Sequence, residues 1–315
     1  MNFSKRVAKV ELSEAKREVI RQAKSIVVYY PRFNEVLAAM EECMFFSAGL
    51  PEPQCMMFTG DTGVGKSCAI TVFENAYPRT DVGHVTRVPV FSAVIPRPTQ
   101  ISGIATNMLA SLGAPRPEKG SVTTKLGQLK TLFKTCGVRL IILDEFQHLI
   151  EHRTRQEVSD AADWIKTLIN ETKIPMVLCG MPSSTQVLDG FDQLRRRFNT
   201  KMELHPFDWD DDEAEFRDML AAIDEQLPFK SPAGLAEDPL APRLWLASMG
   251  KMSSLMQLIG NVAQDAILLD AVRLEPAMFA NYWARKRGER GNPFEAKAAD
   301  ILRLLEKERE KEVVQ

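Results

Sequence analysis

The stretch Gly60–Ser67 has the residue types and spacing of a phosphate-binding site. It fits the pattern G-x-x-x-x-G-K-[ST] at every fixed position. An apolar strand candidate, residues 55–58, precedes it and a helix-like run, residues 68–73, follows it, as the pattern requires. Glycines let backbone N–H groups close around phosphate oxygens, and the helix start adds partial positive charge. The stretch therefore predicts a phosphate-binding loop, and the alternative is an ordinary glycine-rich turn.

Two side chains of this loop have specific expected roles. Lys66 can reach the β- and γ-phosphates of a nucleotide, and the Ser67 hydroxyl can hold Mg²⁺. The helix start also places Cys68 beside the phosphates. The residues expected to contact the nucleotide here are Gly60, Asp61, Thr62, Gly63, Val64, Gly65, Lys66, Ser67 and Cys68.

An acidic pair supplies the second half of the expected site. The apolar run 140–143 leads directly into Asp144 and Glu145. At the carboxyl edge of a parallel sheet, both carboxylates would lie beside the phosphate loop. Asp144 would hold Mg²⁺, and Glu145 would polarise a water for in-line attack on the γ-phosphate. The pair predicts hydrolysis, and the alternative is a strand followed by an acidic helix cap.

A run of arginines precedes the last strand candidate. Arg195, Arg196 and Arg197 end a helix-like segment just before that strand. An arginine in this place can reach the γ-phosphate held by a neighbouring subunit and stabilise transition-state charge. Arg196 and Arg197 are the candidates for this catalytic role, which requires an oligomer. The alternative is a basic helix end that complements the helix dipole.

The elements that must position these residues alternate along most of the chain. Apolar strand candidates separated by helices predict an α/β fold with a parallel sheet covered on both faces. After Pro206 the pattern is helical only. The expected strands are 55–58, 85–94, 138–143, 175–179 and 199–204, and the expected helices include 12–27, 32–47, 99–112, 121–135, 156–171, 242–249, 253–269 and 276–287.

Composition limits the class of protein. The 315 residues are 45% hydrophobic and 26% charged, as in ordinary soluble globular proteins. No apolar run has the roughly 18 residues of a membrane span, and the N-terminus lacks a signal-like apolar core, so we expect a cytoplasmic protein without a membrane partner. The five scattered cysteines predict reduced thiols. The net charge of −2 gives no general attraction to nucleic acid.

Together these residues resemble an AAA+ ATPase, and more narrowly the TniB and TnsC transposition ATPases. The narrower resemblance covers roughly residues 10–295. Besides the phosphate loop and the acidic pair, it rests on Tyr30-Pro31-Arg32, Ile174–Pro182, Leu194–Phe198 and Asn292-Pro293-Phe294.

The resemblance implies a five-stranded parallel sheet of order 5-1-4-3-2, flanked by helices, and a small helical lid. We accordingly expect N-terminal helices in residues 1–50, an ATPase core in 51–206, the lid in 207–290 and a charged tail in 291–315. Tyr30 and Arg32 are further candidates for contact with the nucleotide. The alternative for Tyr30 is packing between helices.

The resemblance also implies function. It implies ATP and Mg²⁺ as ligands, slow DNA-stimulated hydrolysis, and a homo-oligomer that forms a ring or helical filament on double-stranded DNA. Such a protein marks a target for DNA transposition, recruits or activates a DDE transposase, and meets a TniQ-like target-selection protein. The alternatives are a signalling or scaffold ATPase that acts on proteins only, and a replication initiator or helicase loader.

In that family, DNA contacts lie after the second strand and its following helix. Here the corresponding segments supply Arg97, Thr99, Lys119 and Lys125, which suit phosphate contact without base readout. The alternative is that they are ordinary surface polar residues. The sequence departs from the AAA+ pattern where the strand 175–179 ends without a polar sensor residue. Ser183 or Ser184 would substitute for it.

Overall fold

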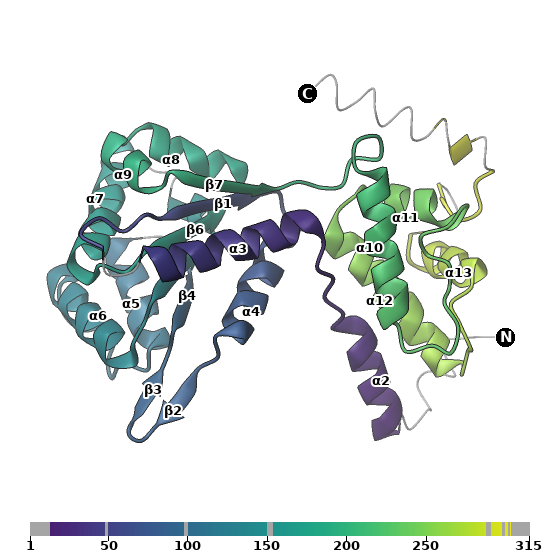
Figure 1. Ribbon diagram of the computed structural model, residues 1–315, viewed down its shortest axis with the longest axis horizontal. Helices are drawn as coiled ribbons and strands as arrows, with labels where there is room; N and C mark the ends of the chain where they lie inside the picture. The colour runs from purple at the N-terminus through teal and green to yellow at the C-terminus, as the bar shows by residue number, and fades with distance from the viewer. Residues whose placement is uncertain are drawn as a thin grey trace. The chain divides into compact units, whose positions relative to one another are not determined.

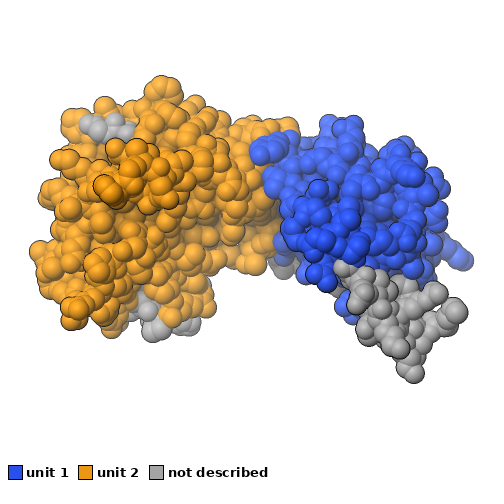
Figure 2. Space-filling model, turned by 90° about the horizontal axis from the view of Figure 1, so that it is seen from below, with its two compact units in different colours: residues 1–30, 206–315 blue, residues 31–205 orange. Residues whose placement is uncertain are grey.

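The structure is a computed structural model that describes residues 13–47, 50–97, 100–149, 154–287, 291–297, 300, 301 and 303. The chain divides into two compact units, which are coloured separately in Figure 2. Residues 31–205 form the α/β unit, and residues 1–30 together with 206–315 form the helical unit.

A five-stranded parallel sheet lies at the centre of the α/β unit, in the order β4-β5-β6-β1-β7 (Figure 1). Strand β1 lies inside the sheet between β6 and the edge strand β7, with Met57 paired to Leu178 of β6 and to Lys201 of β7. Counted along the sheet strands alone, this order is the expected 5-1-4-3-2 read from the opposite edge. The strands are β1 (Met56–Gly60), β4 (Val90–Val94), β5 (Leu140–Asp144), β6 (Met176–Gly180) and β7 (Thr200–Leu204).

The expected strand over residues 85–94 is wrong, because two strands occupy this stretch. β3 (Val85–Arg87) pairs with β2 (Thr80–Val82) in a separate antiparallel hairpin, whereas β4 joins the sheet. Pro89 stands between β3 and β4. Proline has no N–H to donate to a ladder and restricts the residue before it, so the strand is interrupted there.

Helices cover both faces of the sheet (Figure 1). On one face, Ile141 and Leu143 belong to a core cluster with Met108, Phe133 and Leu168 of the covering helices. On the other face, α3 and α4 contact β1. Strands β1, β5 and β6 are therefore buried at every position. The helices of this unit are α3 (Pro31–Phe46), α4 (Lys66–Ala76), α5 (Ile101–Ser111), α6 (Val122–Cys136), α7 (Arg155–Thr172), α8 (Thr185–Asp189) and α9 (Asp192–Arg197).

The helical unit includes the first described helix of the chain. Helix α2 packs against α12, where a Cβ on Gly260 would lie 3.3 Å from Lys24 Cγ. The expected segment 1–50 is thus divided between the two units at Tyr30. None of the described helices is both long and apolar enough to cross a membrane. The helices of this unit are α2 (Glu14–Lys24), α10 (Glu213–Gln226), α11 (Leu240–Ser248), α12 (Met252–Leu268) and α13 (Pro276–Arg287).

The Asn-Pro-Phe segment is part of the packing of the helical unit. Asn292 Nδ2 donates to the carbonyl oxygen of Ala280 at 3.1 Å, and Arg243 donates to the carbonyl oxygen of Pro293 at 2.9 Å. The ring of Phe294 stacks on Phe279, with centroids 5.4 Å apart. These contacts give the segment a structural role. Most of the expected tail beyond it lies outside the described residues.

Candidate functional site

Glycines shape the turn between β1 and α4. Gly63 and Gly65 have φ values of 90° and 116°, which L side chains rarely adopt. A Cβ on Gly60 would lie 2.4 Å from the carbonyl oxygen of Leu204 and 2.8 Å from Val64 Cγ2, so only glycine fits there. No side chain caps the start of α4, which leaves its first N–H groups available to an anion.

Lys66 is held against the loop that precedes it. Its Nζ donates to the carbonyl oxygens of Gly60 at 2.6 Å and Asp61 at 2.9 Å. A phosphate would compete with these carbonyls, because an ammonium group bonds more strongly to a charged oxygen than to a neutral one. The ammonium group is thus already at the phosphate loop before any ligand binds.

Ser67 and Asp144 come together from α4 and β5. Ser67 Oγ lies 3.5 Å from Asp144 Oδ2, while Asp144 Oδ1 accepts a hydrogen bond from the Glu145 N–H at 2.8 Å. Cys179 lies beside Asp144. Burial, followed by the negative charge of Asp144, raises the pKa of the Cys179 thiol and keeps the thiol neutral. A hydroxyl and a carboxylate are oxygen ligands that fit Mg²⁺. No group of three or more His, Cys, Asp or Glu side chains in the described part of the chain could hold a metal by itself.

Glu145 directly follows β5, and its backbone has a left-handed conformation, with φ 59°. Such a φ is uncommon outside glycine, and strained residues cluster at functional sites. Glu145 Oε2 accepts a hydrogen bond from Gln147 Nε2 and lies 3.6 Å from His148 Nε2. The sequence reasoning missed both neighbours. Their position directly after the acidic pair was the only available signal.

The three arginines before β7 differ in their surroundings. Arg195 pairs with Asp192 at 2.9 Å. Arg197 is half-buried and donates to Asn170 Oδ1 at 2.7 Å. Arg196 is exposed, and its guanidinium group makes no hydrogen bond or ion pair with the residues that the structure describes. Of the two catalytic candidates, Arg196 is therefore the one open to a neighbouring copy.

Lys125 is not a surface residue. It is 2% exposed, and its Nζ donates to Ser102 Oγ at 2.9 Å and Thr106 Oγ1 at 2.7 Å, both on α5. These bonds use its ammonium group to hold α6 against α5. The prediction that Lys125 contacts DNA is therefore wrong. The other DNA candidates Arg97 and Lys119 are exposed, and Thr99 lies outside the described residues.

The candidate nucleotide contacts Tyr30 and Arg32 and the candidate sensor residues Ser183 and Ser184 differ in how deeply they are buried. Tyr30 is buried, and its ring packs against Phe207 with centroids 5.2 Å apart, so it lies in a packed core, although neither residue belongs to a helix. Arg32 is half-buried at the start of α3. Ser184 is fully buried, so it cannot act as a sensor on a ligand, whereas Ser183 is exposed.

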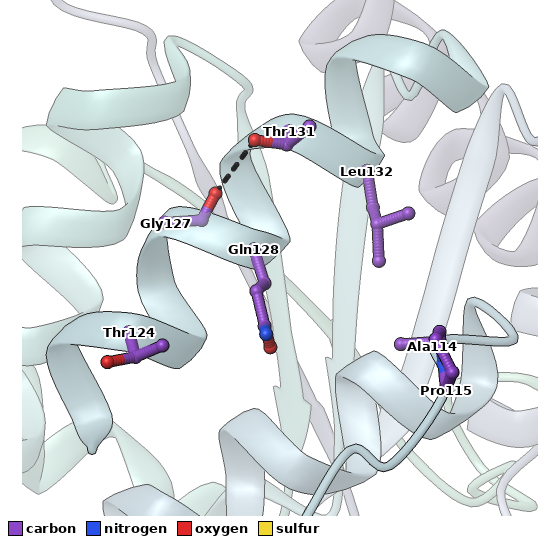
Figure 3. Close-up of a pocket in the computed structure, with 7 residues that line it drawn as sticks. All are labelled: Ala114, Pro115, Thr124, Gly127, Gln128, Thr131 and Leu132. Carbon is purple, nitrogen blue, oxygen red and sulfur yellow. Dashed lines mark hydrogen bonds between the residues drawn. The ribbon is translucent and has the colours of Figure 1, made fainter. Parts of the chain in front are cut away.

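A cavity of about 460 Å³ lies between α6 and the loop after α5 (Figure 3). Thr131 Oγ1 donates to the carbonyl oxygen of Gly127 along its wall at 3.0 Å. No charged side chain lines it and it contains none of the predicted phosphate-site residues, so we do not assign it to the nucleotide. Its lining residues are Ala114, Pro115, Thr124, Gly127, Gln128, Thr131 and Leu132.

Comparison with known proteins identifies the family and the fold. A family model described as "Bacterial TniB protein" matches residues 18–208, more than half of the chain. No curated protein sequence matches the chain. Among solved structures, the Aeropyrum pernix ORC2 protein in ADPNP–ADP complexes has a TM-score of 0.57 at 14% identity, over 90% of this chain and 74% of that chain.

Two more structures have a similar fold. The Aeropyrum pernix ORC1 protein in complex with DNA has a TM-score of 0.56 at 16% identity, over 85% of this chain and 68% of that chain. Cdc6p from Pyrobaculum aerophilum has a TM-score of 0.55 at 13% identity, over 87% of this chain and 71% of that chain. At these identities the likeness shows the fold alone, and it agrees with the parallel sheet flanked by helices that the sequence predicts.

Proposed function

We propose that this chain, which belongs to the TniB family of bacterial proteins, is an ATP-dependent, DNA-binding regulator of transposition. It assembles on target DNA as a ring or helical filament and recruits or activates a DDE transposase. A TniQ-like protein selects the target with it. Family membership supports the transposition context. The observation that carries the ATPase part is the convergence of Lys66, Ser67 and Asp144 at one edge of the sheet.

Each residue at this edge of the sheet has a separate role in hydrolysis. Lys66 exchanges its two loop carbonyls for phosphate oxygens. Ser67 and Asp144 would hold Mg²⁺, which would supply positive charge against the phosphates. Glu145 accepts the proton of the attacking water. Arg196 of a neighbouring copy stabilises the charge that develops on the γ-phosphate.

DNA binding depends on a local basic surface, because the net charge of the chain is −2. Arg97 and Lys119 are exposed and supply phosphate contacts. Such contacts release counterions, so affinity falls steeply as salt rises and depends little on base sequence.

Retention on a random-sequence DNA duplex tests the proposal. We expect retention with ATP or a non-hydrolysable analogue, little retention with ADP, and weaker retention at higher salt. Lys66→Ala should remove the nucleotide dependence, whereas Lys130→Ala, on an exposed face of α6, is the matched control. Retention that ignores both nucleotide and salt contradicts the proposal. A stable protein partner without DNA retention would instead indicate a signalling ATPase.

A further inference from the structure

The carboxylate of Glu145 has a glutamine bound to it. Gln147 lies two residues further along, in the 3₁₀ turn η1 (Phe146–Leu149), and donates from Nε2 to Glu145 Oε2. Gln147 is 6% exposed, so bulk water competes little for its amide. The amide therefore limits the directions in which the Glu145 carboxylate can turn.

The other end of the same amide is held by the turn after β6. Gln147 Oε1 accepts a hydrogen bond from the Met181 N–H at 3.0 Å. If the amide were rotated by half a turn, its oxygen would face the Glu145 carboxylate, which is also an acceptor, and its nitrogen would face the Met181 N–H, which is also a donor. Both hydrogen bonds would be lost. The two partners therefore determine the orientation of the Gln147 amide.

The turn after β6 is shaped to receive Gln147 and also contacts the phosphate loop. A Cβ on Gly180 would lie 2.8 Å from Gln147 Oε1 and 2.6 Å from Ser184 Oγ, so a larger residue would displace the amide. Thr62 Oγ1 of the phosphate loop lies 3.5 Å from Met181 Sδ. Gln147 is thus the link between Glu145 and a turn that contacts the phosphate loop.

We infer that Gln147 is a positioning residue that aims Glu145 at the attacking water and transmits the state of the phosphate loop to it. Strand β6 ends in Cys179 and Gly180 and brings no polar side chain there, apart from the buried thiol. The Gln147 amide, reaching over from η1, supplies the polar group at that position. This inference rests on the proposed hydrolysis of ATP and names a residue that controls it.

Two variants of Gln147 separate its two hydrogen bonds. Gln147→Met removes both, whereas Gln147→Glu keeps the acceptor for Met181 N–H and loses the donor to Glu145. We expect both variants to lower kcat by tenfold or more and to leave the dissociation constant for ATP within twofold, because aiming matters only in the transition state. Gln128→Met, on the exposed face of α6, is the control and should change neither value.

A kcat within twofold of wild type in Gln147→Glu would overturn the inference. So would a loss of ATP affinity as large as the loss of kcat, because the role would then be structural.

A second readout needs no nucleotide. The double variant of Gln147→Glu with Glu145→Gln exchanges the donor and the acceptor and restores the hydrogen bond. We expect its loss of melting temperature to be smaller than the sum of the two single losses. Additive losses would refute the contact. If the wild-type chain hydrolyses no ATP, the proposed function and the catalytic role of Gln147 fail together, while the melting experiment still decides whether the link exists.

Discussion

Replacing Gly60 with alanine tests whether the phosphate loop depends on the close approach of β1 and β7. The new Cβ would lie 2.4 Å from the carbonyl oxygen of Leu204, whereas real Cβ atoms essentially never come closer than 3.0 Å. The shortfall is therefore about 0.6 Å. A backbone oxygen at the end of a strand pair cannot rotate away as a side chain can. We expect a loss of about 1–3 kcal/mol in the free energy of unfolding, the usual cost of overpacking.

The same displacement should weaken ATP binding, because Gly60 begins the phosphate loop and its shift would move the backbone N–H groups that are expected to surround the phosphates. We expect the dissociation constant for a fluorescent ATP analogue to rise about tenfold, equivalent to about 1.4 kcal/mol. Gly103→Ala is the matched control, since a Cβ there has nothing within 4 Å and Gly103 lies in helix α5. It should gain about 0.5–1 kcal/mol of stability and bind normally. A Gly60→Ala protein with wild-type stability in urea and wild-type affinity would refute this reasoning.

Further predictions concern five single side chains. Lys125→Met should lower the free energy of unfolding in urea by about 1–3 kcal/mol, because two hydroxyl groups lose their buried donor. Lys119→Ala should keep its stability and should reduce the slope of DNA affinity against salt concentration by about 1. Cys68 is the exposed thiol among the five cysteines, so a maleimide should label it first. Burial raises the pKa of the Cys68 thiol, so its labelling should still accelerate at a pH where an ordinary exposed thiol is already ionised, and bound nucleotide should slow it. Arg196→Ala should lower kcat by about a thousandfold and leave ATP affinity intact. Wild-type activity in this variant would exclude a role for Arg196 at the γ-phosphate of a neighbouring copy. Arg197→Ala should mainly lose stability, because its side chain bonds to Asn170.

The phosphate loop and the acidic pair could be predicted because their chemistry depends on residues at fixed local spacing. Gly60 and Asp144 end strands and Lys66 opens a helix, and the apolar pattern of these elements is strong. Their place at one sheet edge therefore followed from the topology of parallel strands. The ends of most core strands were predicted to within about two residues for the same reason.

The parts that could not be predicted depend on contacts between distant residues. Lys125 reads as a surface lysine, and only its hydrogen bonds to α5, about twenty residues earlier, explain its burial. Gln147 binds the N–H of Met181, 34 residues away, so its sequence neighbours gave no sign of the link. By contrast, Pro89 is a local signal for the break between β3 and β4, although it lies within a run rich in valine that is typical of one continuous strand.

The rate of ATP hydrolysis with and without duplex DNA at low salt tests the central claim most directly, measured for wild type and for Glu145→Gln. The account predicts that DNA raises wild-type turnover. It also predicts that Glu145→Gln binds ATP, hydrolyses almost none and stays on DNA longer than wild type, because the proton acceptor is lost while the phosphate loop remains intact. Turnover that is the same with and without DNA would contradict the account, as would a Glu145→Gln protein that leaves DNA faster than wild type.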